Sequence, residues 1–308
     1  MDVHDTAPKF KTEISRVGAE SIRLILKTKR TGAINILYPS ISLYVNLPIY
    51  MKGVHISRSL ESIYDVLAMF KNKPVRYLES FCLKIAKALL KKHEYSTLSE
   101  VSLSSDYYIS RMAPLTDNVS DEYCKVHASA LAERADGRIR TRRFIGAEIV
   151  GLTYCPCLIE ELKDEFYASL KKNFSLTDDL AKRIVSETPI ASHNQRCKIY
   201  ALIETSNSVH VDLDDLIEIL IASPSAATFS ILKREDELHL IKQAASRAMF
   251  VEDVLRELSY NLVKLFPNIP DDFIVHIRVE SEESIHKHNL VCENKTSFGK
   301  LKSDLKIS

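Results

Sequence analysis

The sequence predicts an α+β protein in which antiparallel strands alternate with pairs of amphipathic helices. Three observations lead to this class: strand-like alternation in both halves of the 308-residue chain, helical stripes that come in pairs, and an Asp136-Gly137 hairpin signal. A chain of this length is expected to form two domains. The pattern places their boundary near residue 150, giving modules over residues 1–150 and 151–308.

The first half reads as a strand, a helix pair and then more strands. Residues 33–50 are rich in β-branched residues and predict a strand. Residues 59–93 carry two apolar stripes at helical spacing, which Lys73-Pro74 separates into two helices. Antiparallel strands are then expected over residues 98–109, 121–133 and 139–153.

The second half repeats this logic. Helices are expected over residues 158–173 and 177–187, and Ser175 or Thr177 is available to cap the second. The remaining elements are a strand over 197–204, helices over 212–222, 236–248 and 250–265, and strands over 273–280 and 288–293.

Composition narrows the function. The chain is 45% hydrophobic and 27% charged, with a net charge of +1, so bulk electrostatics favour neither a nucleic-acid partner nor a membrane surface. No apolar stretch is long enough to cross a bilayer, and the polar N-terminus carries no secretion signal. We therefore expect a cytoplasmic protein. Only seven glycines occur, and none forms a dinucleotide or P-loop motif, so side chains would have to hold any nucleotide.

Six cysteines are too few for a disulfide framework in a chain of this length, and we expect them to be reduced. Cys82 falls in an apolar helical stripe and is expected to fill the core. The same reading applies to Cys124, Cys197 and Cys292, which leaves Cys155 and Cys157 as the informative pair.

Cys155-Pro156-Cys157 stands at the end of a predicted strand and brings two thiols close together. A thiolate can bind a metal, and a thiol with a lowered pKa can take part in acid–base chemistry. From the spacing alone, a buried and inert pair is the more frequent case. His193 lies just before Asn194-Gln195-Arg196 at the start of a strand; a lone histidine is more often structural, but a strand start this polar is typically exposed or functional.

Glu283 and His286 are three residues apart, and His288 follows. In a helix or tight turn, this carboxylate and imidazole could act as an acid–base pair, whereas in a plain strand the pair would mean little. Glu237 and Glu252 lie in predicted helices and could equally be solvated charges. Each signal is weak, but thiols, imidazoles and carboxylates together indicate a metallohydrolase.

Seven segments add a more specific indication through their order along the chain. They are Lys52–Arg58, His93-Glu94-Tyr95, Cys155-Pro156-Cys157, His193–Arg196, Leu232-Lys233-Arg234, Phe250–Asp253 and Glu283–His286. In this order they resemble the prokaryotic GTP cyclohydrolases of type IB, from about Val17 to the C-terminus.

Within that family, the chain looks most like the archaeal branch, GTP cyclohydrolase IV of methanopterin biosynthesis. A helical insertion over Leu158–Glu187 and the connector Phe266–Asp272 suggest this branch. Tyr154 and Glu235 depart from the family pattern, which has a small residue and a proline there. Neither departure removes an expected ligand.

The resemblance implies a fold and a set of roles. The fold would be a tandem tunnelling fold (T-fold), with antiparallel sheets and helix pairs on one face, assembled into a homotetramer as a dimer of dimers. The C-terminal module would carry most of the metal site. The implied metal ligands are Cys155, His193 and Glu237. Catalysis would fall to Cys157, Glu283 and His286, and Glu252 would anchor guanine. Cations and polar groups expected at the substrate are His55, Arg58 and Arg196, with Lys233 as a further candidate for the triphosphate.

The implied reaction opens the imidazole ring of GTP at C8 and releases formate. In the archaeal branch the product would be 7,8-dihydroneopterin 2′,3′-cyclic phosphate, with Fe(II) as the metal and Mn(II) or Zn(II) as alternatives. The bacterial branch gives 7,8-dihydroneopterin triphosphate for folate. Two rival readings are a structural protein with a closed zinc site and another tunnelling-fold enzyme that acts on a pterin or purine without opening the ring.

Overall fold

The computed structural model describes residues 3–30, 33–70 and 73–307. The helices are η1 (Val3–Asp5), α1 (Ile56–Met69), α2 (Leu78–Lys92), α3 (Pro156–Phe174), α4 (Asp178–Glu187), α5 (Leu213–Ala222), α6 (Arg234–Ser246), α7 (Val251–Leu265) and α8 (Phe298–Leu305). The strands are β1 (Ile14–Arg23), β2 (Leu26–Arg30), β3 (Ala33–Leu37), β4 (Ser40–Leu47), β5 (Leu98–Met112), β6 (Val119–Ala135), β7 (Arg138–Tyr154), β8 (Asn194–Thr205), β9 (Ala226–Ala227), β10 (Ile274–Ser281) and β11 (Leu290–Ser297).

One large sheet carries most strands in the order β1-β4-β5-β6-β7-β8-β10-β11, with β9 paired to β7. The pairs β1–β4, β4–β5, β7–β9 and β10–β11 are antiparallel, and β2–β3 forms a separate antiparallel hairpin. Asp136 and Gly137 join β6 to β7 with φ values of 53° and 72°, as a tight hairpin turn requires. The structure confirms the α+β class and the antiparallel sheet.

The chain divides into two compact units that interleave along the sequence. Unit 1 comprises the residues up to Tyr107 together with Lys125–Ala147 and Leu202–Leu213, and unit 2 comprises the others. Strands β5 to β8 contribute residues to both units. The division into modules at residue 150 stays a prediction.

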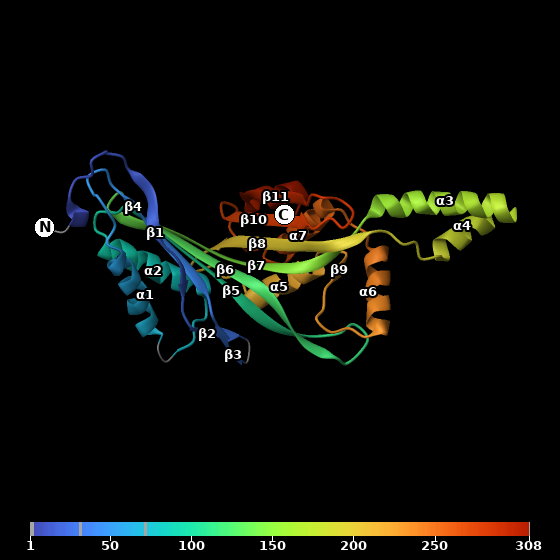
Figure 1. The fold of residues 1–308 in the computed structure, drawn as a ribbon, viewed down its shortest axis with the longest axis horizontal. Coiled ribbons are helices and arrows are strands. Elements are labelled where there is room, and N and C mark those ends of the chain that lie inside the picture. The colour runs from blue at the N-terminus through green and yellow to red at the C-terminus, as the bar shows by residue number, and fades with distance from the viewer. Residues whose placement is uncertain (1–2, 31–32, 71–72, 308) are drawn as a thin grey trace. The chain divides into compact units, whose positions relative to one another are not determined.

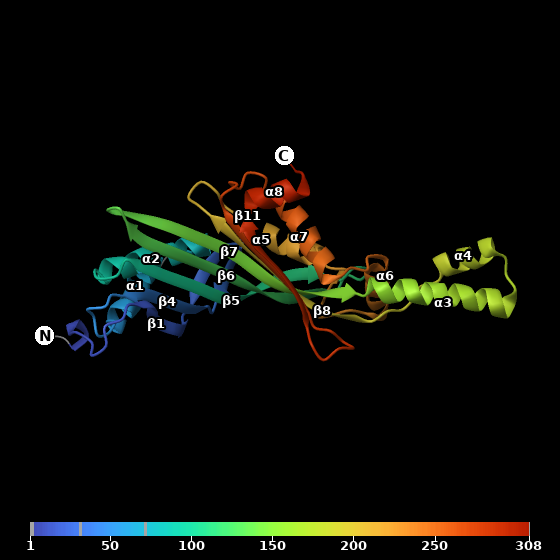
Figure 2. The same ribbon diagram turned by 90° about the horizontal axis from the view of Figure 1, so that it is seen from above.

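In unit 1, helices α1 and α2 form the expected pair, visible beside β4 and β5 in Figures 1 and 2. The two helices meet through Phe70 and Phe81, whose rings are edge-on with centroids 5.7 Å apart. Ser99 on β5 donates through Oγ to the Ala86 carbonyl at 2.8 Å, which fixes α2 on the sheet. The fully buried face of α2 explains its apolar stripe.

In unit 2, α7 packs on β10 and β11, and α8 packs on β11 (Figure 2). Alternate residues of β10 are buried, with Val275, Ile277 and Val279 facing the core. The sequence has the same alternation of apolar and polar residues, and the strand predicted over residues 273–280 is confirmed as β10. The final helix α8 was not expected; Ser297 caps it by accepting a hydrogen bond from the Lys300 N–H at 3.2 Å.

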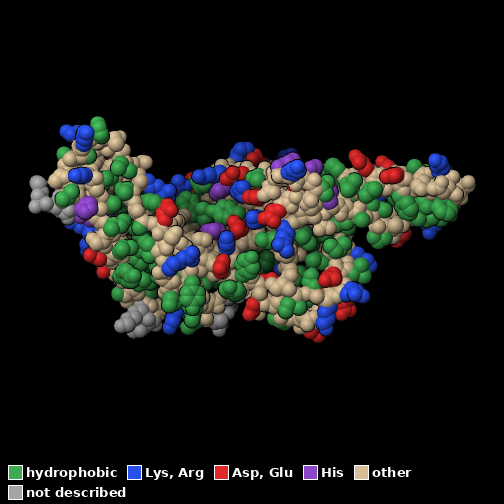
Figure 3. All heavy atoms as spheres, in the orientation of Figure 1, with side chains coloured by type: hydrophobic (Ala, Val, Ile, Leu, Met, Phe, Trp, Pro, Cys, Tyr) green, Lys and Arg blue, Asp and Glu red, His purple; other side chains and the backbone are tan. Residues whose placement is uncertain are grey.

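Helices α3 and α4 run side by side as an arm that begins at the end of β7 (Figures 1 and 2). Pro156 opens α3, and Thr177 caps α4 by accepting from the Leu180 N–H at 3.4 Å. A small core of its own, centred on Leu170, Ala181 and Val185, holds the two helices together. Figure 3 shows hydrophobic side chains scattered among acidic and basic ones along this arm. The two helices predicted over residues 158–173 and 177–187 are confirmed, and their status as an insertion stays a prediction.

The expected strand over residues 33–50 is wrong in one respect. The chain forms two strands there, β3 and β4, which belong to different sheets. Pro39 separates them, since a proline provides no N–H for a ladder. Two further strands, β1 and β2, precede them and were not expected; most of β1 is exposed, so it lacks the buried alternation that marks a strand.

The cysteines behave as composition suggests. Cys82, Cys124 and Cys197 are buried, and burial raises the pKa of Cys197 to about 12. Cys292 is partly buried. Among the described helices, none is both long and apolar enough to span a membrane.

Candidate active site

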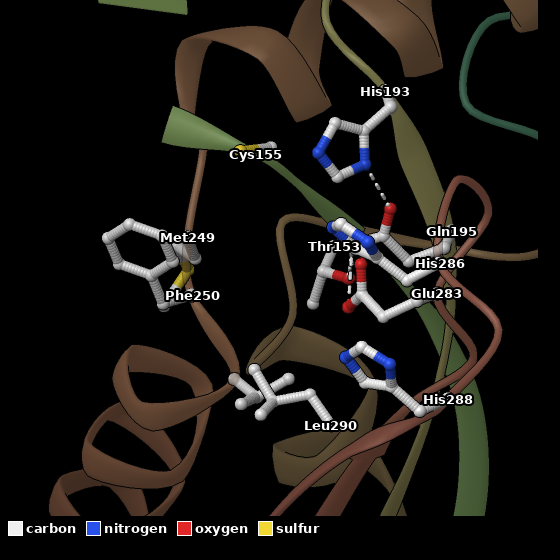
Figure 4. Close-up of a pocket in the computed structure, with 11 residues that line it drawn as sticks. Thr153, Cys155, His193, Gln195, Met249, Phe250, Glu283, His286, His288 and Leu290 are labelled. Carbon is white, nitrogen blue, oxygen red and sulfur yellow. Dashed lines mark hydrogen bonds between the residues drawn. The ribbon is translucent and has the colours of Figure 1, made fainter. Parts of the chain in front are cut away.

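A pocket of about 240 Å³ in unit 2 collects side chains from four separate segments (Figure 4). Thr153 and Cys155 come from the end of β7, and His193 and Gln195 from the start of β8. The remaining lining residues are Met249, Phe250 and Val251 at the start of α7, and Glu283, His286, His288 and Leu290, which lie between β10 and the first residue of β11. Four of the predicted site residues therefore share one pocket: Cys155, His193, Glu283 and His286.

Backbone contacts at the base of the arm hold Cys155 and His193 together. The Cys155 N–H donates to the His193 carbonyl at 3.2 Å. Ser192 adds two bonds, since its N–H donates to the Tyr154 hydroxyl at 3.0 Å and its Oγ donates to the Cys155 carbonyl at 3.0 Å. The thiol and the imidazole thus meet because the arm begins and ends at the same place.

The hydrogen bonds of Gln195 determine the tautomer of His193. Nδ1 of His193 lies 2.9 Å from Oε1 of Gln195, an oxygen that can only accept (Figure 4). Nε2 of Gln195 points the other way, donating to Thr153 Oγ1 at 3.2 Å and to Glu283 Oε1 at 3.5 Å. Nδ1 of His193 therefore carries the proton, and the lone pair of the neutral ring is on Nε2.

Glu283 is held by a hydroxyl in addition to the Gln195 amide. Ser281 Oγ donates to Glu283 Oε1 at 2.7 Å, and Ser281 Oγ lies 3.5 Å from Thr153 Oγ1. Ser281 and Thr153 are buried, at 0% and 1% exposure. A chain of contacts thus runs from His193 through Gln195 to Glu283, which orients an imidazole and a carboxylate within one pocket.

His286 and His288 form one wall. Their rings are stacked, with centroids 5.3 Å apart and an angle of 20° between planes. Phe250 and Leu290 lie on the rim, each 43% exposed. The pocket therefore combines polar groups with flat and apolar surfaces, as a site for a heterocycle would.

Several predicted site residues lie outside this pocket lining. Cys157 is exposed in the first turn of α3. Glu237 is exposed on α6, and Glu252 is exposed in the first turn of α7. Arg196 lines a different cavity of unit 2. Their proposed roles stay predictions.

His55 and Arg58 belong to unit 1. His55 is 7% exposed and precedes α1; its Nε2 lies 2.9 Å from Asp5 Oδ1 and its N–H donates to the Tyr95 hydroxyl at 3.4 Å. Arg58 is exposed in the first turn of α1. The Lys52–Arg58 and His93–Tyr95 motifs therefore lie together.

His93 is the centre of that arrangement. It is fully buried, with Ser59 Oγ 2.9 Å from Nε2 and the Tyr95 hydroxyl 2.8 Å from Nδ1. Burial, with smaller contributions from Arg58 and His55, lowers the pKa of His93 to about 4. The ring is neutral at physiological pH.

The donor chemistry of the pocket fits two ligands of a borderline divalent cation, the Cys155 thiol and Nε2 of His193. The hydrogen bond from Nδ1 to Gln195 is the kind of outer contact that orients a metal-binding imidazole. A third ligand is not assembled: among residues 3–30, 33–70 and 73–307, no three His, Cys, Asp or Glu side chains are grouped to hold a metal ion.

Reasoning from the sequence missed three residues that organise the site. Gln195 could have been found, because residues two apart on a strand face the same side and His193 was already a candidate. Thr153 and Ser281 are small hydroxyl residues within strands, and no sequence signal distinguishes them from ordinary core positions.

Comparisons with known proteins agree on one family. Residues 1–292 match the model of the type I GTP cyclohydrolase folE2 family. GTP cyclohydrolase MptA of Methanothermobacter thermautotrophicus is 36% identical over 306 residues, covering 99% of this chain and 95% of the relative. MptA of Methanobrevibacter smithii is 35% identical, covering 99% and 98%, and MptA 2 of Methanocella arvoryzae is 36% identical, covering 99% and 98%.

Solved structures support the fold alone. The uricase from Arthrobacter globiformis superposes with a TM-score of 0.52 at 10% sequence identity, covering 95% of both chains. A hyper-thermostable AgUricase mutant gives the same TM-score at 11% identity, covering 92% of this chain and 91% of the mutant. The architecture is thus that of the tunnelling fold, as expected.

Proposed function

This chain belongs to the type I GTP cyclohydrolase folE2 family, and from that premise we propose that it opens the guanine ring of GTP at C8. Formate is released, and the ring closes again with ribose carbons to give 7,8-dihydroneopterin 2′,3′-cyclic phosphate for methanopterin biosynthesis. The likeness to the MptA relatives over the full chain favours this product over the linear triphosphate.

The observation that carries the proposal is the meeting of Cys155, His193, Glu283 and His286 in one pocket. C8 of guanine is a poor electrophile, so its hydration needs a nucleophile, an acid for the ring nitrogen and an oriented substrate. The pocket offers a thiol, an imidazole whose Nε2 makes no hydrogen bond within the described residues, and a carboxylate with a second imidazole.

We propose that a divalent metal ion, Fe(II) first and Mn(II) or Zn(II) as alternatives, binds Cys155 and His193, with Glu237 as the third ligand. When bound, such an ion lowers the pKa of a water molecule and makes hydroxide available near neutral pH. Glu237 would have to enter the pocket, since it is exposed on α6 in the single chain.

The chain's own groups would then handle protons and orientation. Gln195 keeps the Nδ1 proton on His193, so that Nε2 faces the pocket. His286, paired with Glu283, would protonate a ring nitrogen of guanine as water adds to C8, and the Cys157 thiol would assist. Gln195 and Ser281 hold the Glu283 carboxylate in place.

Recognition of GTP would use further residues of the family motifs. Glu252 would accept the two parallel N–H donors of the guanine edge. His55 and Arg58 would contact the rest of the nucleotide, and the guanidinium group of Arg58 is suited to phosphate. We further propose a cytoplasmic homotetramer, a dimer of dimers, which light scattering of the purified protein would test.

The decisive experiment is anaerobic incubation of the purified protein with GTP and Fe(II), Mn(II) or Zn(II), followed by mass spectrometry. We expect formate, a cyclic phosphate of dihydroneopterin, and diphosphate in equal amounts, since cyclisation at the α-phosphorus expels diphosphate. Formate with the linear triphosphate would assign the chain to the folate branch.

Two variants separate the roles of the cysteines. Cys157→Ala should lose turnover but keep its metal, whereas Cys155→Ala should lose both. Loss of metal in Cys157→Ala would mean that the two thiols have exchanged roles. No formate with any metal would favour a binding or structural protein.

A further inference from the structure

A second cavity, of about 680 Å³, lies in unit 2 and is separate from the candidate active site. On β8, Gln195 lines the first pocket, whereas Arg196 and Lys198 line the second. Successive side chains of a strand point to opposite faces, so the two cavities lie on opposite faces of this strand. Likewise, Glu283 lines the first pocket and the adjacent Glu282 lines the second cavity.

The acidic groups of this cavity are already satisfied. Glu282 pairs with Lys198, Oε1 to Nζ, at 2.7 Å. Glu122 accepts three hydrogen bonds, from Ser120 Oγ at 2.6 Å and from the N–H and Oγ of Ser230 at 2.7 and 2.8 Å. Burial alone would raise the pKa of Glu122, but these bonds outweigh it and the pKa is lowered, so the carboxylate is ionised and occupied.

Arg111 is a half-buried cation with spare donors. Its guanidinium lies over the Phe229 ring, 4.4 Å from the centroid, and makes one long hydrogen bond of 3.4 Å to the Thr228 carbonyl. Burial is the main cause that lowers the pKa of Arg111, which marks the loss of water around this charge. A guanidinium has five N–H donors, so most of them face the cavity or solvent.

Arg196 adds a second open guanidinium. It is exposed, and within the described part of the chain its side chain has no ion-pair or hydrogen-bond partner. The cavity therefore has two cations with free donors, while both of its carboxylates are engaged. Phe229, Tyr123 and Leu152 supply an aromatic and apolar surface beside them.

We propose that this cavity is a second ligand site, for a small phosphorylated heteroaromatic compound. Guanidinium groups bind phosphate through paired hydrogen bonds, and a flat ring can lie against the Arg111–Phe229 stack. The volume is in the range of small-molecule sites, roughly 300–1,000 Å³.

Neopterin phosphate is a suitable probe, since it combines a phosphate with a flat bicyclic ring; its choice rests on the proposed product. Calorimetry would use protein carrying His193→Ala, which removes a candidate metal ligand from the first pocket, so that binding dependent on Arg111 can be assigned to the second cavity. We expect one binding event per chain, weakened at least about tenfold by Arg111→Gln and much less by Arg111→Lys. The exposed Arg183 on α4 provides the matched control Arg183→Gln, which should bind as the parent does.

Three outcomes would overturn the proposal: no binding, equal affinity in Arg111→Gln and the parent, or equal affinity for inorganic phosphate and neopterin phosphate. Phe229→Leu tests the ring contact independently and should weaken neopterin phosphate but not inorganic phosphate. Formate release from GTP is measured separately on protein with an intact His193. A failed cyclohydrolase assay therefore leaves the binding result readable, and the reverse also holds.

Discussion

Two histidines in different units show how similar surroundings produce different chemistry. His93 in unit 1 and His193 in unit 2 each have one ring nitrogen held by a polar side chain. The other nitrogen of His93 is occupied by Ser59 Oγ, whereas within the described residues Nε2 of His193 has no hydrogen-bond partner. Because both ring nitrogens of His93 are engaged, its hydrogen bonds fix the chain around it. His193 keeps one nitrogen lone pair that a ligand can bind.

Burial sharpens the contrast. His93 is fully buried, and its pKa of about 4 keeps it neutral, so it can serve as a rigid spacer between α1 and Tyr95. His193 is partly exposed in a pocket. Whether the second ring nitrogen already has a hydrogen-bond partner therefore distinguishes a histidine that positions the chain from one that can bind a ligand.

The largest effect should come from His193→Ala. Removal of this lone pair should lower the rate of formate release by more than roughly 100-fold, the upper limit typical of residues that only contact a metal ligand. It should also lower the amount of bound metal. The measurement is turnover and metal content. His210→Ala, which removes an exposed histidine stacked on Tyr77, should leave both unchanged; equal losses in the two variants would break the comparison.

Gln195→Leu should come next, with a loss of roughly 10- to 100-fold in metal affinity or activity. The substitution removes the acceptor that keeps the proton on Nδ1 of His193. Gln195→Glu keeps an acceptor for that proton but adds a charge beside Glu283, so it should retain metal better than Gln195→Leu while still impairing turnover. Wild-type metal binding in Gln195→Leu would contradict the tautomer assignment.

His93 should affect the folding stability of the chain rather than its metal binding. Its pKa is about 4 in the folded chain and about 6.5 when unfolded, so the unfolded state binds more protons between these values. Stability is therefore fully present above pH 6.5 and falls as the pH drops towards 4, by up to about 3 kcal/mol.

Urea unfolding at pH 7.5 and 5 would measure this loss. His93→Gln should be less stable at pH 7.5 but should show a smaller loss between the two pH values. His239→Gln, at an exposed position on α6, is the control and should keep the wild-type pH dependence. An unchanged pH dependence in His93→Gln would show that other groups are responsible.

The smallest effects should come from two matched tyrosines. Tyr95→Phe loses the contacts to His93 and to the His55 N–H, and Tyr154→Phe loses the contact to the Ser192 N–H. Each should cost about 1 kcal/mol of folding stability. Only Tyr154→Phe should also reduce metal affinity, because it loosens the segment that carries His193; equal metal affinity in both variants would contradict this difference.

Much of the fold could be predicted because its signals are local. Periodicity places α1, α2, β5 and the helices of the arm, and Asp136-Gly137 marks the hairpin through the φ values it allows. Strand β1 escaped prediction because it is largely exposed. The pairing of β3 with β2 rather than with the large sheet depends on contacts that sequence periodicity does not contain.

The candidate site could be predicted only in part. Cys155, His193, Glu283 and His286 carry reactive groups and stand in motifs, so they were identified. Thr153 and Ser281 act through geometry alone, and nothing in their type reveals it. Glu237 and Glu252 were assigned by resemblance, and the single chain leaves them exposed.

The contacts that join the two ends of the arm, formed by α3 and α4, have a further consequence for how the length of this chain can vary. Residues 156–192 contain α3 and α4 and form an excursion whose ends are joined by the Cys155–His193 backbone bond. For a flexible loop, each doubling of length costs only roughly 0.6 kcal/mol in closure entropy. The length of the arm can therefore change at little cost, while the contacts at its base keep the two metal-binding candidates, Cys155 and His193, together.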